Sequence, residues 1–398
     1  MIFLQMRGVG RAMSNKIKCG IVGVGYISKF HIDAIRRIGW VDIEAVVDSN
    51  YELAKEKARE YFVPKCYKGI NKLLADKSIS VIHNCTPNNM HFGISEKIIN
   101  SGKHIFSEKP LAVNSKEGNR LVELVRRNTK IVAGVNFNYR MNPLVQEIKW
   151  RIKRGDIGKP ILVHGSYLQD WLLYETDYNW RVESNLGGPS RCIADIGSHW
   201  IDLAQNILGD KIVEVCSDLV TVHKIRKRPK TQVETFAKAF NIEYEDRKID
   251  TEDYGSVMFK MKSGIHGVFY ASEVSPGRKC YFNIEIDGTK SSVYWNQEIA
   301  DWMWVGNREK DNMLVMRNPN LMTEEAKMYT SLAAGHPEGW NDALKNNIYS
   351  FYKFIADGKE MYKDHCDFAT FEEANCILKI TEAILGSNRK RRWQIVEN

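Results

Sequence analysis

Long hydrophobic runs are missing from this chain of 398 residues: no stretch of about 18 apolar residues occurs, so we expect no membrane span. The first residues lack the apolar segment of a secretion signal, and we interpret residues 1–14 as a disordered extension, with Met13 as an alternative start. None of the eight cysteines forms a C-x-x-C pair, which predicts reduced thiols in a cytoplasmic protein.

Features of nucleic-acid binding are also scarce. The net charge is +8, and much of the excess lies in two basic runs, residues 224–230 and 389–392. Neither zinc-finger spacing nor a basic surface interleaved with aromatic residues accompanies these runs. We interpret them as solvated faces and expect no nucleic-acid partner.

The length and composition favour a globular protein of two domains. Hydrophobic residues make up 43% of the chain and charged residues 27%, as in soluble folded proteins. In the first third of the chain, apolar runs that predict buried strands alternate with amphipathic segments that predict helices. This alternation is typical of a doubly wound parallel sheet with helices on both faces.

A glycine-rich turn follows the first predicted strand, at residues 16–24. Residues 23–28 fit the pattern G-x-G-x-x-small, in which Gly23 permits a tight turn and Gly25 lets a phosphate approach the backbone. A second predicted strand, residues 43–47, ends in Asp48, which is 23 residues beyond Gly25. A carboxylate there accepts hydrogen bonds from ribose hydroxyls and repels a 2′-phosphate, so we expect NAD rather than NADP. The alternative is that Asp48, Ser49 and Asn50 form a polar turn.

The alternation continues with predicted strands at residues 80–85, 103–106 and 130–136, and with helices at 28–38, 51–61 and 91–101. Lys109 follows one of these strands, in the sequence Glu108-Lys109-Pro110. A fully buried lysine must be paired or neutralised, so Lys109 is not core filler. Ligands of parallel sheets bind at the carboxyl ends of the strands, where Gly23, Asp48, Thr86 and Lys109 should all face one crevice.

A second group of reactive side chains lies between residues 180 and 202. If one helix holds through this region, Asp195 and His199 are four residues apart on one face. An imidazole can take a proton from a substrate hydroxyl, and a neighbouring carboxylate can orient it. The alternatives are an acidic residue placed for the helix dipole beside a structural histidine, or zinc. No further ligands occur at zinc-site spacing, and we expect no metal.

The rest of the chain predicts a mostly antiparallel sheet. Alternating and β-branched segments, separated by glycine turns, occur at residues 161–166, 213–222, 234–241, 253–261, 264–271, 279–287 and 290–295. Helices are predicted at residues 143–154 and from 342 to about 356. The loop before the second of these contains His336, Glu338 and Trp340, which can contact a sugar ring and its hydroxyls or merely lead into the helix.

Several motifs together resemble the signature of the glucose–fructose oxidoreductase / inositol dehydrogenase / MocA (Gfo/Idh/MocA) family. Residues 85–112 match C-T-P-N-x-x-H followed by G-K-H and E-K-P-L-A, and residues 137–140 match F-N-x-R. Residues 187–202 match G-G-x-x-x-x-D-x-G-x-H-x-x-D, and residues 336–340 match H-x-E-G-aromatic. The resemblance extends from Lys16 to the C-terminus, with Ser28 in place of the usual Gly or Ala as a mild departure.

The resemblance implies a Rossmann domain at residues 15–136 and an α+β domain at 137–398, whose last helices pack back on the first domain. In this family the open face of the large sheet commonly meets another subunit, so a homo-oligomer is expected. The implied NAD-binding residues are Gly23, Gly25, Tyr26, Ile27, Asp48, Ser49, Thr86, Pro87, Asn88, His91, Glu108, Lys109 and Asn138. The implied substrate residues are Tyr139, Trp180, Arg181, Arg191, Asp195, His199 and His336.

The expected reaction is NAD-dependent oxidation of a secondary hydroxyl, in particular at carbon 3, of a pyranose sugar or glycoside. Lys109, His199 and Asp195 are the expected catalytic residues, and the sequence leaves open whether Lys109 or His199 is the base. Inositol dehydrogenation is an alternative. A second alternative is a glycosidase that uses NAD for transient oxidation and elimination.

Overall fold

The first of two large sheets carries the glycine-rich turn. The computed structural model describes residues 16–230 and 243–397, so the predicted extension at residues 1–14 and the predicted strand at 234–241 lie outside the described residues. The strand order is β17-β6-β5-β4-β1-β2-β3, with all neighbours parallel except β17. The strands are β1 (Ile17–Val22), β2 (Val41–Val47), β3 (Lys65–Tyr67), β4 (Val81–Asn84), β5 (His104–Ser107), β6 (Ala133–Val135) and β17 (Ala369–Thr370).

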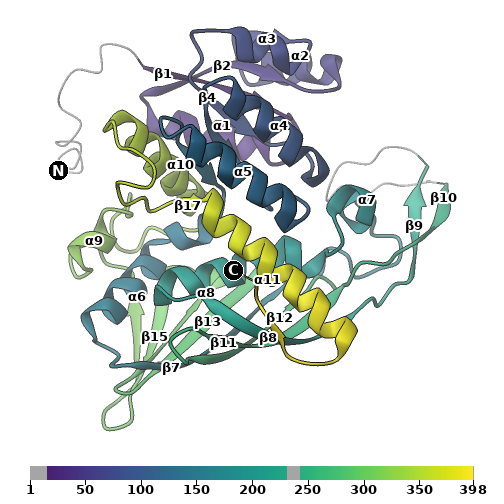
Figure 1. Ribbon diagram of the computed structural model, residues 1–398. Helices are drawn as coiled ribbons and strands as arrows, with labels where there is room; N and C mark the ends of the chain where they lie inside the picture. The colour runs from purple at the N-terminus through teal and green to yellow at the C-terminus, as the bar shows by residue number, and fades with distance from the viewer. Residues whose placement is uncertain (1–15, 231–242, 398) are drawn as a thin grey trace.

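Helices cover both faces of this sheet, as the strand–helix alternation predicted (Figure 1). They are α1 (Ser28–Ile38), α2 (Tyr51–Glu60), α3 (Ile70–Ala75), α4 (Asn88–Asn100) and α5 (Ser115–Arg127). The prediction of a Rossmann sheet is therefore confirmed. It missed the helices α3 and α5 and the short strands β3 and β17. The strand β3 has only three residues with partly buried side chains, so it offers no apolar run.

The second sheet has nine strands in the order β16-β15-β14-β13-β7-β12-β11-β8-β18, and only the β7–β12 pair is parallel. Its strands are β7 (Pro160–Leu168), β8 (Ile212–Val220), β11 (Tyr254–Met261), β12 (His266–Ser272), β13 (Tyr281–Gly288), β14 (Ser292–Asn296), β15 (Trp302–Gly306), β16 (Met313–Met316) and β18 (Gln394–Ile395). The predicted mostly antiparallel sheet is confirmed, with β15 and β16 in addition. Trp295 lies in the core of this sheet and is fully buried.

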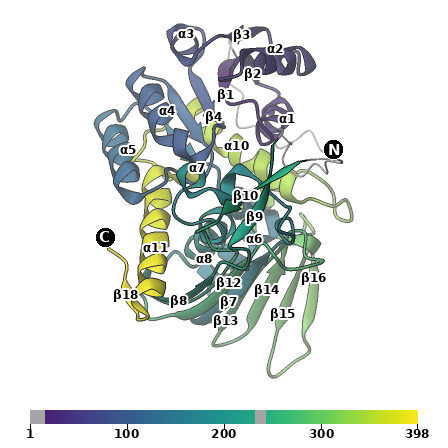
Figure 2. The same cartoon turned by 90° about the vertical axis from the view of Figure 1, so that its right-hand side faces the viewer.

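Three helices, α6 (Pro143–Arg154), α8 (Ser198–Leu208) and α11 (Phe371–Lys390), lie between the two sheets, and the lower face of the second sheet carries no described helix (Figures 1 and 2). The helix α10 (Trp340–Ala356) packs against α1, and α11 packs against α5 and β8. Two segments from the end of the chain thus complete the first domain. The short helices are η2 (Asn138–Met141), η3 (Trp180–Val182), α7 (Ser184–Gly187), η4 (Ile193–Gly197), η5 (Gln297–Ile299) and α9 (Glu324–Lys327).

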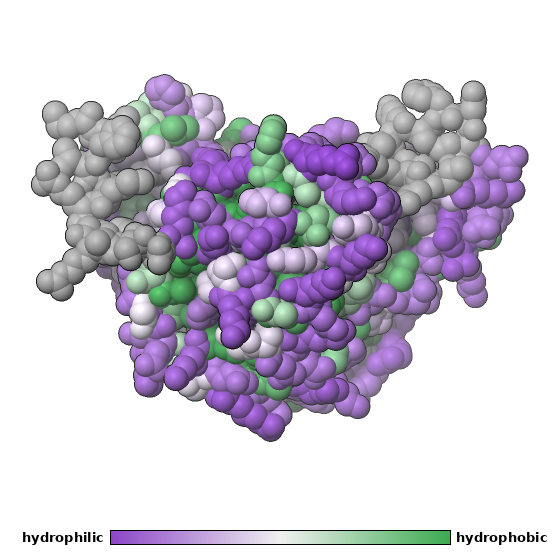
Figure 3. Space-filling model, turned by 90° about the horizontal axis from the view of Figure 1, so that it is seen from above, coloured by the Kyte–Doolittle hydropathy of each residue, from purple (hydrophilic) through white to green (hydrophobic). Residues whose placement is uncertain are grey.

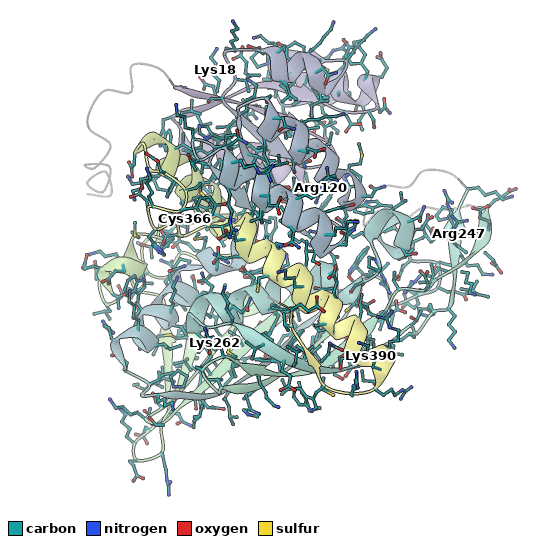
Figure 4. The ribbon with its side chains drawn as sticks, in the orientation of Figure 1. Lys18, Arg120, Arg247, Lys262, Cys366 and Lys390 are labelled. Atoms are coloured by element: carbon teal, nitrogen blue, oxygen red, sulfur yellow. The ribbon has the colours of Figure 1, made fainter. Side chains whose placement is uncertain are left out.

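A two-stranded hairpin, β9 (Ile225–Pro229) and β10 (Tyr244–Lys248), contains most of the first basic run. Arg226 is fully buried and donates to Asp253 Oδ1 at 2.6 Å and to the carbonyl of Leu172 at 2.9 Å. Arg247, labelled in Figure 4, pairs with Glu183 at 3.0 Å. Arg226 of the basic run and Arg247 of the neighbouring strand are therefore both held by ion pairs within the chain.

The surface seen from the Rossmann end is largely hydrophilic, with smaller apolar patches between polar residues (Figure 3). All eight cysteines are unpaired. Among the described residues, no helix has both the length and the apolar character needed to cross a membrane.

Candidate active site

The glycine-rich turn has the geometry that a dinucleotide requires. Gly23 has a φ of +87°, and a Cβ added there would lie 2.7 Å from the carbonyl oxygen of Cys85. Only glycine fits this position without moving backbone. A Cβ added at Gly25 would meet no protein atom within 4 Å. The backbone at Gly25 thus faces open space at the start of α1, where a pyrophosphate approaches in Rossmann folds.

Asp48 lies beside this turn, at the end of β2. Its Oδ2 accepts a hydrogen bond from the backbone N–H of Val24 at 2.9 Å, and its Oδ1 accepts from the N–H of Asn50 at 2.9 Å. Ser49 Oγ donates to Oδ1 at 3.3 Å. The turn thus fits a pyrophosphate, and the fixed carboxylate of Asp48 beside it fits an adenosine ribose. Tyr26 is 45% exposed at the mouth of the turn, and Ile27 next to it is partly buried.

The loop after β4 links the two domains. Pro87 precedes the first residue of α4, and Asn88 Nδ2 donates to the carbonyl of Gly187 at 3.0 Å. Thr86 Oγ1 donates to Asn84 Oδ1 at 2.7 Å. His91, by contrast, is 1% exposed, and its ring nitrogens lie 2.6 Å from the carbonyl oxygen of Pro110 and 2.7 Å from that of Thr86. His91 therefore joins two loops of the site and has no ring nitrogen left for the cofactor.

Lys109 pairs with Asp195 across the domain boundary. Lys109 Nζ donates to Asp195 Oδ1 at 2.5 Å and to the Asp195 carbonyl at 2.9 Å. Burial would raise the pKa of Asp195, but the charges of Lys109 and Arg181 and the hydrogen bond from Lys109 together outweigh burial and hold that pKa well below its ordinary value. Arg181, stacked on Trp180 with its guanidinium carbon 4.5 Å from the ring centroid, lies 3.7 Å from the same Oδ1.

The helix that carries Asp195 differs from the predicted one. Asp195 lies in the π-helical turn η4, and α8 begins only at Ser198. The wider turn directs the Asp195 carboxylate to Lys109, and no hydrogen bond joins it to His199 among the described residues. Glu252, which no sequence pattern singles out, accepts hydrogen bonds from Ser190 Oγ at 2.6 Å and from the Ile193 N–H at 3.0 Å. It thereby fixes the start of the π-helical turn.

His199 lies against aromatic rings and is 8% exposed. The ring centroid of Tyr139 is 4.9 Å away and that of Phe137 is 5.6 Å away, both edge to face. Its Nδ1 is buried, and no described residue hydrogen-bonds it. Burial, and then the charge of Lys109, lower the pKa of His199 to about 3. His199 is therefore a neutral imidazole that interacts with the charges of Lys109 and Asp195, and neither of its ring nitrogens has a hydrogen-bond partner among the described residues.

Arg191, expected to bind substrate, is placed elsewhere. It is 2% exposed and forms ion pairs with Asp253 and, at 2.6 Å, with Glu273. Because both acids come from distant strands and loops, the sequence could not separate this structural role from a pocket role. Arg140 likewise is buried in an ion pair with Asp202.

The remaining predicted residues divide between the site and its surroundings. Asn138 is 2% exposed, and its Nδ2 has no hydrogen-bond partner among the described residues, so this amide remains available to a ligand. Tyr139 Oη hydrogen-bonds Tyr167 Oη at 2.7 Å. His336 is exposed on its loop, and the Trp340 ring packs edge to face on Phe30, with centroids 5.1 Å apart. Glu108 points into the core of the first domain, away from a cofactor.

Potential metal ligands gather in a different place. Within the described part of the chain, His164, Glu285 and Asp287 have ligand atoms within 4.8 Å of one another, on β7 and β13 of the large sheet. They are remote in the fold from Asp195 and His199, which themselves join no such group.

Comparison with known proteins assigns the class. Residues 17–137 match the family model described as the oxidoreductase family NAD-binding Rossmann fold, and residues 145–294 match the Gfo/Idh/MocA C-terminal domain. The chain belongs to the Gfo/Idh/MocA family of oxidoreductases, and its first domain binds NAD.

Individual relatives are similar over nearly the whole chain. Levoglucosan dehydrogenase from Pseudarthrobacter phenanthrenivorans is 27% identical over 389 residues, which cover 95% of this chain and 97% of that protein. Glucose-6-phosphate 3-dehydrogenase from Bacillus subtilis is 25% identical over 70% of this chain and 74% of its own length. A structure of levoglucosan dehydrogenase in complex with NADH and levoglucosan has a TM-score of 0.85 at 26% identity and covers 96% of this chain and 100% of its own.

Proposed function

We propose that this protein oxidises a secondary hydroxyl of a pyranose sugar or glycoside to a ketone, at carbon 3. One observation carries the proposal: Lys109 of the NAD-binding domain and Asp195 of the second domain meet at 2.5 Å, and the neutral imidazole of His199 interacts with the charges of both. This arrangement offers a cation, a carboxylate and a neutral imidazole to one hydroxyl group. NAD, when bound, supplies the oxidising power.

The proposed role of Lys109 is electrostatic. Its ammonium group hydrogen-bonds the reacting oxygen and stabilises the negative charge that develops there as the proton leaves. Asp195 holds Lys109 in place through two hydrogen bonds.

The hydroxyl proton passes either to His199 or to Lys109. His199 is neutral because burial and then the charge of Lys109 lower its pKa to about 3, so it can accept the proton while Lys109 stays an ammonium ion. If Lys109 is the acceptor, it must be uncharged before the proton arrives, and it becomes the ammonium ion beside the new carbonyl oxygen. Which of the two groups is the base is left to experiment.

The sugar class is supported by the relatives, whose names specify levoglucosan and glucose 6-phosphate as substrates. Trp180 and Trp340 provide flat apolar faces near the site, which suit a pyranose ring. A myo-inositol 2-dehydrogenase from Thermotoga maritima is 23% identical over 70% of this chain and 75% of its own length, so a cyclitol is the alternative substrate.

The first experiment follows reduced nicotinamide by its absorbance. Purified protein is mixed with NAD⁺ or NADP⁺ and a panel of glucose, glucosides, levoglucosan, myo-inositol and acidic sugars. We expect NADH with a glucopyranose compound and little signal with NADP⁺. Turnover of myo-inositol alone would instead favour the cyclitol. Glycoside cleavage without net NADH would favour the glycosidase that oxidises its substrate transiently.

The Lys109→Met variant tests the mechanism. We expect kcat to fall by roughly 10²- to 10⁴-fold, the usual contribution of a positioned proton-transfer group. Lys72→Met, on the exposed surface of α3, is the matched control and should retain full activity. Near-normal turnover in Lys109→Met would contradict the shared mechanism.

We also propose a homo-oligomer formed through the open face of the second sheet, in the cytoplasm, where eight unpaired cysteines are stable. Large apolar side chains on that face are 42–50% exposed: Leu162, Met258, Val268 and Tyr270. An apolar patch of this kind favours a protein partner. Light scattering should give a mass above that of one chain, and Met258→Lys with Val268→Lys should reduce it.

A further inference from the structure

A chain of buried hydrogen bonds runs behind Lys109. Tyr352 Oη on α10 lies 2.8 Å from His83 Nε2 on β4, and His83 Nδ1 lies 2.8 Å from His31 Nδ1 on α1. His31 Nε2 lies 2.8 Å from Glu108 Oε1. The three ring-bearing residues are 0% exposed, and Glu108 is 6% exposed.

The far end of this chain is the residue next to Lys109. Glu108 Oε1 also accepts from Asn136 Nδ2 at 2.6 Å, and Glu108 Oε2 accepts from the backbone N–H of Lys109 at 3.3 Å. Asn347 Nδ2 on α10 donates to Asn136 Oδ1 at 3.0 Å. The side chains of Glu108 and Lys109 thus point in opposite directions, one into this network and the other to Asp195.

Proton positions along the chain follow from the acceptors. Burial raises the pKa of Glu108, but its hydrogen bond from His31 and the other neighbours lower it to about 2, so Glu108 is a carboxylate that only accepts. His31 must then carry a proton on Nε2. Burial keeps the pKa of His83 well below its ordinary value, so His83 has a single N–H. That single N–H serves either His31 Nδ1 or the Tyr352 hydroxyl, and the group at the other ring nitrogen donates to His83.

We propose that His31 and His83 are positioning residues for Lys109, through the hydrogen bonds that connect Tyr352, His83, His31 and Glu108 in series. The network holds the Glu108 carboxylate, and the backbone at Glu108 presents the Lys109 ammonium group to Asp195 and the substrate hydroxyl. Because Tyr352 and Asn347 both lie on α10, the returning helix is a part of this support. The inference rests on the proposed role of Lys109 in alcohol oxidation.

Two substitutions of His31 separate positioning from packing. In His31→Gln the amide nitrogen reaches about as far as Nε2 and can still donate to Glu108, whereas the shorter Asn cannot. We expect His31→Asn to lower kcat by roughly 10- to 100-fold, the size of effect that misplacement of a catalytic group produces, with KM for NAD within about 2-fold. We expect His31→Gln to keep kcat within about 3-fold of the wild type. His104→Asn, at a half-buried histidine outside the network, is the control with unchanged kcat.

Equal kcat in the wild type and His31→Asn would overturn the proposal, as would equal losses in His31→Asn and His31→Gln. If His31→Asn does not fold, His83→Phe, which removes the hydrogen bond to His31, takes its place with the same expectation. Imidazole ¹⁵N spectra of the wild type test the hydrogen bond to Glu108 without any substrate. A proton on His31 Nε2 supports it, and an unprotonated His31 Nε2 overturns it. This readout stands even if the proposed oxidation fails in the substrate panel.

Discussion

The two glycines of the nucleotide turn should respond to the same substitution in opposite ways. In Gly23→Ala the new Cβ would lie 2.7 Å from the Cys85 carbonyl oxygen, a backbone atom that cannot move alone. The positive φ of +87° adds about 1–2 kcal/mol of strain for an L-residue. Overpacking against backbone costs typically about 1–3 kcal/mol more. The free energy of unfolding should therefore fall by about 2–5 kcal/mol.

Gly25→Ala should leave stability unchanged and weaken NAD binding. Its Cβ would meet no protein atom within 4 Å, but it would occupy the space that the pyrophosphate approaches. Loss of one or two hydrogen bonds to a charged group, at about 1.5–3 kcal/mol each, corresponds to an affinity loss of at least about 10-fold. Gly93→Ala, within α4 and with no contact inside 4 Å, is the control and should be stabilised by about 0.5–1 kcal/mol.

Two measurements on the three variants suffice. Equilibrium urea unfolding gives the change in stability, and titration calorimetry with NAD gives the dissociation constant. If Gly25→Ala bound NAD as tightly as the wild type, the pyrophosphate could not lie against this turn. If Gly23→Ala unfolded at the same urea concentration as the wild type, the steric argument for the turn would be wrong.

Three further changes test other parts of the structure. Asp48→Asn removes the charge that opposes a 2′-phosphate, so the ratio of kcat/KM for NAD to that for NADP should fall by about 10-fold or more. Arg226→Met leaves the buried Asp253 with one fewer cation and should cost about 3–5 kcal/mol in urea unfolding, whereas Arg228→Met, whose side chain is 41% exposed, should cost less than about 1 kcal/mol. Burial lowers the pKa of His104 from its ordinary 6.5 to about 4. The contribution of neutral His104 to the free energy of unfolding is therefore complete above pH 6.5 and falls by up to about 3 kcal/mol as the pH falls toward 4. His104→Asn should flatten this dependence of stability on pH.

Local features of the site could be predicted from the sequence. The tight turn at Gly23, the carboxylate at Asp48 and the lysine after β5 each depend on a strand and the residues that directly follow it. Hydrophobic periodicity places the strands, and the carboxyl ends of parallel strands necessarily meet at one edge of the sheet. These residues could therefore be brought together without any knowledge of the second domain.

The long-range pairs could not be predicted in this way. Lys109 and Asp195 are separated by 86 residues, and their contact depends on a π-helical turn that helical periodicity cannot reveal. The family resemblance implies Arg191 as a substrate residue, but its partners Asp253 and Glu273 lie at the adjacent ends of β11 and β12, far along the chain. His31 and His83 lie within apolar segments. The sequence signal for their hydrogen-bond network with Glu108 was the histidine at a buried position of a predicted strand, His83.

The site exists only where the two domains meet, and this has a consequence for what each domain can do alone. The first domain contains every residue of the glycine turn, but Asp195, the partner that fixes the Lys109 ammonium group, belongs to the second domain. The amide of Asn88 likewise finds its acceptor at Gly187, and the hydrogen-bond network behind Lys109 ends on α10. NAD recognition is thus encoded largely within the first domain, whereas the geometry of the reacting groups requires the full chain. Substitutions at the domain boundary should therefore reduce kcat before they reduce the affinity for NAD.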